Sequence, residues 1–289
     1  MEVHATVDAL RAALRPRRAQ GGRIALVPTM GALHEGHLSL VRVAMRRAAT
    51  VTVSIFVNPL QFGAGEDFTA YPRDLERDLA RLKRERVDVV FVPEADGFTR
   101  GLRTTVHVAG LTGHLEGASR PGHFDGVTTI VGKLLGAVQP DVAVFGEKDY
   151  QQLVIVRRMV RDLDLGVEIV GAPLVREPDG LAASSRNAHL SPDERRSALA
   201  LSRALSAARE AWGGDAGRAR GLLRSRLQKA PGIRLDYAEV VDPSTLEPLE
   251  GVVQGSARAL VAAFVGRTRL IDNMGLESPG AEPSGRARD

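Results

Sequence analysis

Two histidines lie three residues apart in the segment PTMGALHEGH, where they could act on a phosphate group. The segment follows a short apolar run that predicts a strand, and a helix is expected to begin within it. His34 and His37 would then share one face of the first helical turn, and Gly36 between them would let a ligand approach the backbone. A helix start offers free N–H groups and the positive end of the helix dipole, and histidine can donate a proton near neutral pH. The pattern favours a phosphate site, and the alternative is a pair of polar residues that cap a helix.

Polar groups also follow two other predicted strands. In FVNPLQFG, the amides of Asn58 and Gln61 could orient a small polar substrate without adding charge; the alternative is an Asn-Pro turn with Gln61 in solvent. In VFGEKDYQQL, Lys148 is expected in the first turn of a helix. A cation is unfavourable there unless an anion binds beside it, so this position favours a phosphate contact. The alternative is a surface ion pair with Glu147 or Asp149.

A fourth segment, DGLAASSRNAHLSPDE, carries two hydroxyls and a planar cation on small residues. Ser184, Ser185 and Arg186 could close over phosphates as a mobile loop, although a serine–arginine loop alone is a weak signal. The string HEGH is not a zinc-protease motif, because H-E-x-x-H requires histidine where Leu38 stands.

Alternating strands and helices are expected to position these loops. The predicted strands are Arg23–Val27, Val51–Val57, Val87–Val92, Asp141–Phe145 and Val167–Val175, and the predicted helices are Gly36–Ala49, Pro72–Arg86, Gly126–Val138 and Lys148–Leu163. Continuous apolar strands in strand–helix units predict a doubly wound parallel α/β sheet with helices on both faces. Ligands bind such sheets at the carboxyl ends of the strands, where the strand order reverses.

The pattern changes near residue 176, where a smaller α+β domain is predicted. Its expected helices are Ser191–Trp212 and Ala216–Gln228, and its expected strands are Arg234–Val241, Arg258–Val265 and Thr268–Asp272. The predicted organisation is a catalytic domain over residues 1–175, a smaller domain over 176–275 and a disordered tail over 276–289. The tail is predicted from its polar, Pro- and Gly-rich composition (ESPGAEPSGRARD).

Composition excludes several classes of protein. The 289 residues include no cysteine, which excludes disulfides, thiolate metal sites and cysteine nucleophiles. No signal peptide or apolar stretch of membrane-spanning length is apparent, so we expect a soluble cytosolic protein. The net charge of +4 is small, and only Lys83, Lys133, Lys148 and Lys229 among the 39 basic residues are lysine. This composition is more typical of an arginine-rich surface than of a nucleic-acid-binding stripe.

Taken in this order, the segments resemble the pantothenate synthetase (pantoate–β-alanine ligase) family. The resemblance rests on VPTMGALHEGH, VSIFVNPLQFG, AYPRD, LEGASRPGHFDGV, VFGEKDYQQLV, DGLAASSRN and TRLIDN, which extend over the chain to about Asn273. A wider superfamily shares H-x-G-H, whereas the other strings are characteristic of this family. The resemblance implies a Rossmann-like fold of the nucleotidyltransferase type with a smaller lid domain. It also implies an ATP-dependent ligase that joins pantoate to β-alanine through a pantoyl-adenylate, releasing AMP and pyrophosphate.

The resemblance further implies roles for individual residues. His37 is the expected proton donor, with His34 and Lys148 beside it on the phosphates. The expected ATP-binding residues are Pro28, Met30, Gly31, His34, Gly36, His37, Gly146, Glu147, Lys148, Asp149, Val175, Ala183, Ser184, Ser185 and Arg186. The expected substrate-binding residues are Gln61, Gln152, Asn58 and Arg120. Mg²⁺ is expected mainly on the ATP phosphates, with Asp78 as the acidic residue nearest to it.

Ala183 departs from the family, which often has methionine or leucine before the two serines. One alternative function is an adenylyl transferase acting on a phosphorylated acceptor, which would call for more cations near Gln61. A more remote alternative is a basic nucleic-acid-binding module, disfavoured by an aromatic content of 4%. We expect a homodimer with small-molecule substrates and no nucleic-acid or membrane partner.

Overall fold

The computed structural model describes residues 1–63 and 68–277. It divides into two compact units, and the boundary between them falls between Val175 and Arg176. Each unit has its own sheet and its own hydrophobic core.

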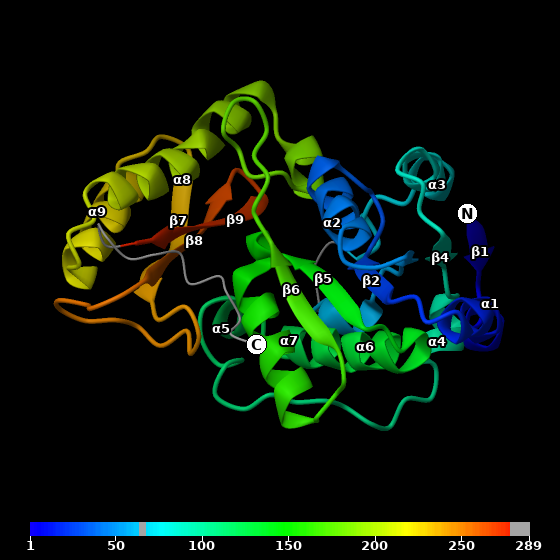
Figure 1. Ribbon diagram of the computed structural model, residues 1–289. Helices are drawn as coiled ribbons and strands as arrows, with labels where there is room; N and C mark the ends of the chain where they lie inside the picture. The colour runs from blue at the N-terminus through cyan, green and yellow to red at the C-terminus, as the bar shows by residue number, and fades with distance from the viewer. Residues whose placement is uncertain (64–67, 278–289) are drawn as a thin grey trace. The chain divides into compact units, whose positions relative to one another are not determined.

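Unit 1 is built on a six-stranded parallel sheet with the strand order β1-β4-β3-β2-β5-β6 (Figure 1). Its strands are β1 (Glu2–His4), β2 (Ile24–Thr29), β3 (Thr50–Ile55), β4 (Val89–Phe91), β5 (Val142–Gly146) and β6 (Glu168–Ala172). Its α-helices are α1 (Val7–Ala19), α2 (Glu35–Met45), α3 (Leu75–Arg84), α4 (Ala95–Thr99), α5 (Glu116–Ser119), α6 (His123–Val138) and α7 (Tyr150–Asp162). Two 3₁₀ turns, η1 (Pro59–Gln61) and η2 (Glu147–Asp149), follow β3 and β5.

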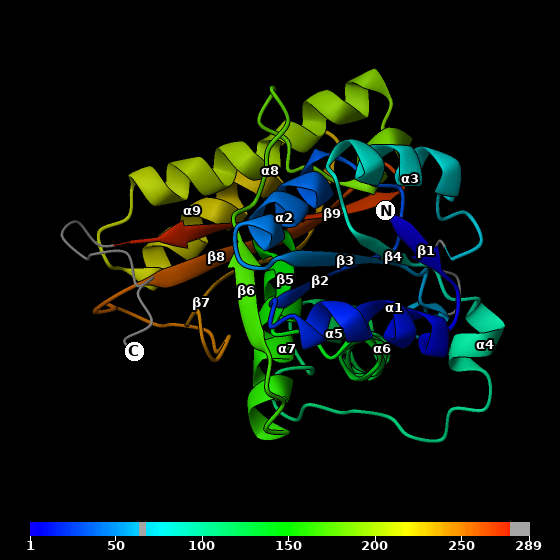
Figure 2. The ribbon, with the colours of Figure 1, turned by 45° about the vertical axis from the view of Figure 1, so that its right-hand side comes forward.

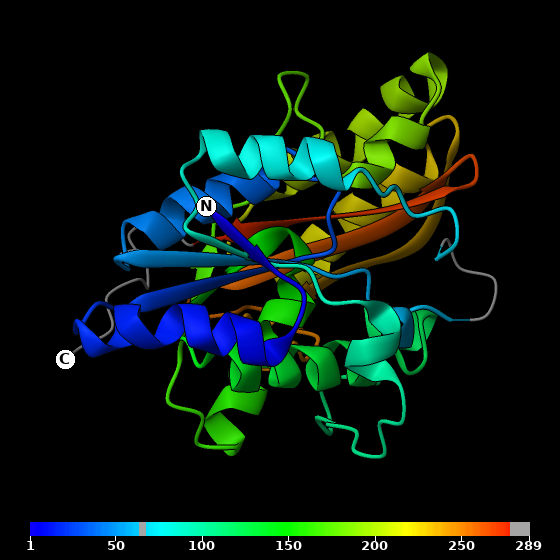
Figure 3. The same ribbon diagram turned by 90° about the vertical axis from the view of Figure 1, so that its right-hand side faces the viewer.

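Both faces of this sheet are covered, as the continuous apolar strands predict. Leu26 and Phe145 face a core shared with α1, α6 and α7, while Val27 and Val144 face a core shared with α2 and α3. Figures 2 and 3 show α2 and α3 on one face of the sheet and α1 on the other. The prediction of a doubly wound parallel α/β sheet is therefore confirmed.

The strand order reverses at β2. The chain continues from β2 to β3 on one side, and β5 later pairs with β2 on the other, with Ala25 opposite Val142 and Leu26 opposite Ala143. Parallel neighbours end at the same edge of a sheet, so the loops that follow β2 and β5 begin side by side. This is the switch point at which doubly wound sheets bind ligands.

Unit 2 is the smaller α+β part. Helices α8 (Pro192–Glu210) and α9 (Ala216–Gln228) pack against an antiparallel sheet of β7 (Ile233–Val241), β8 (Ala257–Val265) and β9 (Thr268–Leu276). A 3₁₀ segment, η3 (Ser185–His189), precedes α8. Helix α8 begins with a capping box, in which the Ser191 hydroxyl accepts the Glu194 N–H and the Glu194 carboxylate accepts the Ser191 N–H.

Several details differ from the sequence predictions, and three of them bear on the argument below. The elements β1 and α1 were not predicted, because β1 is a three-residue edge strand and α1 is polar with Pro16 inside it. Lys148 lies in η2 rather than in a first α-helical turn, since α7 begins only at Tyr150. The fully buried Leu276 ends β9 and is not part of the tail, whose residues 278–289 lie outside the described residues.

Within the described residues, no helix is both long enough and apolar enough to cross a membrane.

Candidate active site

The loop after β2 makes a tight turn before α2. Gly31 has φ +82° and Ala32 has φ +49°, so two consecutive residues adopt the left-handed conformation. A Cβ atom on Gly31 would lie 2.9 Å from Oδ2 of Asp78 and 3.2 Å from Cγ2 of Ile55. Glycine is therefore required here by conformation and by space.

The two histidines cap α2 reciprocally. Nδ1 of His34 accepts the Gly36 N–H at 3.1 Å, and Nδ1 of His37 accepts the His34 N–H at 3.3 Å. The ring centroids are 4.1 Å apart. Because both Nδ1 atoms accept hydrogen bonds, the proton of each neutral imidazole resides on Nε2. Each ring therefore carries an Nε2–H donor at the start of the helix.

Burial of the imidazole, together with the neighbouring His34, lowers the pKa of His37 from 6.5 to about 3. Lys148 also lowers this pKa, while Asp149 raises it. Near neutral pH the His37 ring is therefore neutral and acts as a hydrogen-bond donor. An anion bound beside it would favour the protonated form, so the expected role of proton donor requires the nucleotide to be present.

This pKa predicts how stability depends on pH. The unfolded chain takes up a proton at His37 near pH 6.5, whereas the folded chain does so only near pH 3. The unfolding free energy should therefore fall as the pH is lowered between these values, by up to about 1.4 kcal/mol per pH unit from this group. Urea unfolding of wild type and His37→Gln at several pH values measures the effect. A flatter dependence in the variant is expected, and parallel curves would contradict it.

Lys148 lies close to the histidines because the strands that precede them, β5 and β2, are paired. It lies in η2, directly after β5, and its Nζ is 3.2 Å from Oδ1 of Asp149. The ion pair with Asp149, which was the alternative to a phosphate contact, is therefore present, but it does not lie on a surface far from the histidines. Both members directly follow β5, whose parallel partner β2 precedes the histidines, so they lie at the same edge of the sheet and act electrostatically on the buried His37. Two histidine donors and a lysine cation thereby converge from separate loops.

The amides after β3 form a second cluster. Asn58 is 2% exposed, and its Nδ2 donates to Oε1 of Gln61 at 3.1 Å and to the Gly126 carbonyl at 3.0 Å. Its Oδ1 accepts the Leu60 N–H. Nε2 of Gln61 lies 3.0 Å from Sδ of Met30 in the β2 loop. Asn58 therefore holds Gln61, and Gln61 is the amide that lies against the histidine-bearing loop.

Residues at the start of α6 fix the backbone of this cluster. The Gln61 carbonyl accepts from Arg120 at 3.2 Å and lies 2.8 Å from Nδ1 of His123. A Cβ on Gly126 would lie 2.1 Å from the Leu60 carbonyl oxygen, so only glycine allows α6 to approach η1 this closely. Arg120, predicted from the SRPGHF string, is thus adjacent to Gln61.

The two adjacent glutamines of α7 differ in burial and in hydrogen bonding. Gln151 is buried, accepts the Glu116 N–H and donates to the carbonyls of Leu111 and His114. Gln152 is partly exposed and makes no side-chain hydrogen bond among the described residues. The family resemblance implied a role for Gln152, and the buried Gln151 was not predicted, because the string QQ gives no signal that separates a buried amide from an accessible one.

Asp78 is hydrogen-bonded to the loop that follows β2. It is 2% exposed, and its two carboxylate oxygens accept the N–H groups of Ala32 and Leu33, each at 2.8 Å. Burial raises the pKa of this carboxyl, the two backbone hydrogen bonds lower it, and the net shift is upward. Across residues 1–63 and 68–277, no group of three or more His, Asp or Glu side chains is placed to hold a metal ion.

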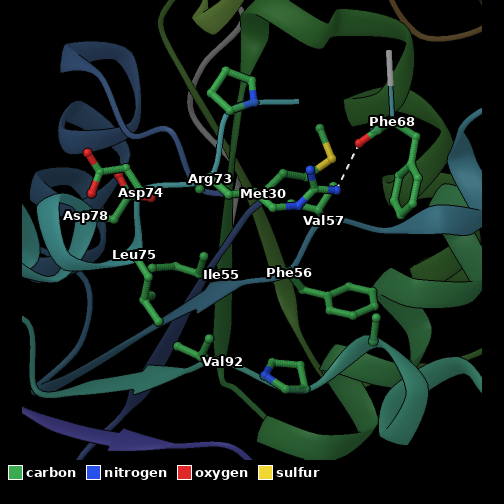
Figure 4. Close-up of a pocket in the computed structure, with 14 residues that line it drawn as sticks. Met30, Ile55, Phe56, Val57, Phe68, Arg73, Asp74, Leu75, Asp78 and Val92 are labelled. Atoms are coloured by element: carbon green, nitrogen blue, oxygen red, sulfur yellow. Dashed lines mark hydrogen bonds between the residues drawn. The ribbon is translucent and has the colours of Figure 1, made fainter. Parts of the chain in front are cut away.

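A cavity of about 240 Å³ lies at the carboxyl ends of β3 and β4, beside the start of α3 (Figure 4). It is largely apolar, with Ile55, Phe56 and Val57 on one wall. Met30, Gly31 and Asp78 also line it. His34, His37, Lys148, Gln61 and Gln152 do not line this cavity, so it lies beside the convergent polar groups rather than among them.

Unit 2 carries the remaining residues predicted to bind ATP, Ala183, Ser184, Ser185 and Arg186. Ser184 caps η3, and its hydroxyl accepts the Arg186 N–H at 3.3 Å. Nδ2 of Asn187, a buried residue, donates to Glu177 at 2.7 Å and to the Ala182 carbonyl at 2.9 Å. These bonds anchor the serine–arginine segment within unit 2. Val175, also predicted at the ATP site, is the last residue of unit 1 and is partly exposed.

The chain is similar in sequence to proteins of one enzyme family over nearly its whole length. A sequence model of the pantoate–β-alanine ligase family matches residues 2–275. The chain is 55% identical over 280 residues to a pantothenate synthetase of Saccharopolyspora erythraea, covering 94% of this chain and 90% of that one. It is 51% identical to a pantothenate synthetase of Salinibacter ruber, covering 98% of this chain and 100% of that one.

Solved structures of the same family also match this chain. The crystal structure of pantothenate synthetase from Thermus thermophilus matches with a TM-score of 0.90 and 52% identity, covering 96% of this chain and 100% of that one. A pantoate–β-alanine ligase from Francisella tularensis, crystallised with a β,γ-ATP compound and β-alanine, matches with a TM-score of 0.78 and 32% identity, covering 95% and 97% of the two chains.

Proposed function

Because this chain belongs to the pantoate–β-alanine ligase family, we propose that it joins pantoate to β-alanine and cleaves ATP to AMP and pyrophosphate. The observation that carries the proposal is the convergence of His34, His37 and Lys148 at the carboxyl ends of β2 and β5. Two donors at the N-terminus of α2 and a cation in the neighbouring η2 suit a polyphosphate. The adjoining amide cluster around Gln61 suits a small polar acid.

The first step is formation of pantoyl-adenylate. A carboxylate oxygen of pantoate attacks the α-phosphorus of ATP, and the bond from that phosphorus to the leaving pyrophosphate breaks. This attack requires alignment and charge neutralisation rather than a nucleophile from the protein. The Nε2–H groups of His34 and His37 donate to the phosphate oxygens, and the Lys148 ammonium offsets the charge that develops on them.

The second step forms the amide. The unprotonated amine of β-alanine attacks the activated carbonyl carbon, the carbon–oxygen bond to AMP breaks, and the nitrogen loses a proton. Gln61 contributes to binding both substrates, and Gln152 and Arg120 contribute to holding pantoate. Two contacts support this assignment: Asn58 donates to Oε1 of Gln61 and so orients its amide, and Arg120 donates to the backbone carbonyl of the same residue.

The remaining assignments concern ATP and its metal. We assign to the ATP site the residues that lie close in sequence to His34, His37 and Lys148. These are Pro28, Met30, Gly31, Gly36, Gly146, Glu147 and Asp149. Val175 and the segment Ala183–Arg186 are assigned to the same nucleotide. Mg²⁺ is assigned to the ATP phosphates, where it would neutralise negative charge.

The reaction products test this function. Purified protein given Mg²⁺, ATP, pantoate and β-alanine should form pantothenate with equal amounts of AMP and pyrophosphate. Omitting pantoate should abolish pyrophosphate release, and a phosphorylated acceptor such as phosphopantetheine should not replace pantoate. Formation of ADP and phosphate, or turnover of the phosphorylated acceptor alone, would contradict the proposal.

A cytosolic homodimer remains the expected form of the protein. Light scattering coupled to gel filtration measures the oligomeric state directly, and a mass of twice 31.0 kDa is expected.

A further inference from the structure

We infer that Asp78 is a positioning residue that locks the histidine-bearing loop in its working conformation, and that it is not a ligand of Mg²⁺. The inference begins from the geometry of its carboxylate. Oδ2 accepts the Ala32 N–H and Oδ1 accepts the Leu33 N–H, each at 2.8 Å. Both oxygens are therefore directed at consecutive amides of one loop.

The surroundings of Asp78 would accommodate an apolar side chain, so the carboxylate is not required for packing. Helix α3 is strongly polar, and its only buried side chains are those of Asp78 and Leu82, one turn apart. Leucine or alanine at position 78 would continue that apolar stripe without the desolvation of a carboxyl. The buried carboxylate is compensated by the two loop N–H groups, and Arg81 donates to the Leu33 carbonyl of the same loop.

The loop needs such a restraint because its conformation is strained. Gly31 and Ala32 both have positive φ, and for Ala32 the left-handed region is disfavoured by its Cβ. A conformation of this kind persists where the surroundings determine it fully. Here the Gly31 N–H donates to Oγ1 of Thr29 at 3.3 Å, so three consecutive amides of the turn have acceptors.

The restraint acts on the histidines through the chain. Leu33 is followed directly by His34, whose backbone N–H donates to Nδ1 of His37 and whose ring caps α2. Releasing Ala32 and Leu33 would free the segment that determines where both Nε2–H donors point. It also follows that the N–H groups of residues 31–33 are occupied within the protein and are not available to a phosphate.

The variant Asp78→Asn tests the inference, which rests on the proposed function for its activity readout. The amide retains the shape of the carboxyl but replaces one acceptor by an NH₂ donor that faces a loop N–H. We expect kcat to fall roughly 100-fold, as for a small misplacement of reacting groups, with the KM for ATP little changed. The Mg²⁺ concentration for half-maximal activity should remain that of wild type.

Two further variants separate positioning from other roles. Asp78→Glu keeps the charge that a metal would bind, but its longer side chain would displace the loop, so it should not restore activity. Asp74→Ala is the matched control, because it removes the N-cap of the same helix, where the Asp74 side chain accepts the Arg77 N–H, and leaves both loop bonds in place. It should lower stability while keeping kcat near that of wild type.

Hydrogen exchange supplies a readout that does not depend on activity. In wild type, the amides of Ala32 and Leu33 should be protected, and in Asp78→Asn they should exchange faster while the β2 amides remain protected. Unprotected Ala32 and Leu33 amides in wild type would overturn the inference even if the variant failed to fold. Full activity of Asp78→Asn, or its recovery at high Mg²⁺, would also overturn it. Failure of the wild type to make pantothenate would instead count against the proposed function.

Discussion

Replacing His37 by alanine is expected to lower kcat for pantothenate formation at least about 100-fold, the usual cost of losing a main transition-state donor. In the structure its Nδ1 accepts the His34 N–H, so its Nε2 carries the proton that can be donated. The ring is neutral near pH 7 because its pKa is lowered to about 3. His37→Gln presents an amide N–H near the position of Nε2 and should retain more activity than alanine.

Steady-state kinetics with pyrophosphate detection measures this effect. His107→Ala is the matched control, since His107 has a 58% exposed side chain and pairs only with Asp125 among its described contacts. The control should be as active as wild type. If His37→Ala matched it, His37 would have no role in the transfer.

Replacing Lys148 by alanine is expected to cost roughly 100-fold or more in the rate of pyrophosphate release. Lys148 lies at the end of β5, and its charge acts on the His37 ring. Because Lys148 lowers the pKa of His37, its removal should additionally let His37 take up a proton at higher pH.

The control for this variant is Lys83→Ala, which removes an exposed lysine from α3. Single-turnover formation of the adenylate, followed in both variants without β-alanine, isolates the first chemical step. Lys148→Ala should be impaired in that step and Lys83→Ala should not. Full activity of Lys148→Ala would refute the role assigned to Lys148.

The sequence predicted the arrangement of the site where simple rules apply. Apolar strands followed by polar loops indicated a parallel sheet, and the strand-end rule then indicated that the loops bearing His34 and Lys148 should meet. Both loops begin at the paired strands β2 and β5. The reciprocal capping by His34 and His37 is also local, since residues three apart at a helix start face each other.

What the sequence could not predict depends on tertiary contacts. Asp78 looks like one more charge on a polar helix in the sequence. Only its packing against the β2 loop, which precedes it by about 46 residues, shows that its carboxylate accepts two backbone N–H groups. Gln151 and Gln152 are likewise indistinguishable until the 111–116 segment covers one of them. The helix was predicted to begin at Lys148, two residues before α7 begins at Tyr150, because the boundary between η2 and α7 carries no capping residue with a side-chain hydrogen bond.

Isotope transfer from pantoate tests the central claim most directly. If the carboxylate of pantoate attacks the α-phosphorus, then pantoate labelled with ¹⁸O in its carboxylate should pass one labelled oxygen to AMP for each pantothenate formed. Mass spectrometry of the AMP measures this transfer. Labelled AMP is the result predicted for an adenylate formed beside His34, His37 and Lys148. Label in inorganic phosphate, or unlabelled AMP with full pantothenate formation, would contradict the account.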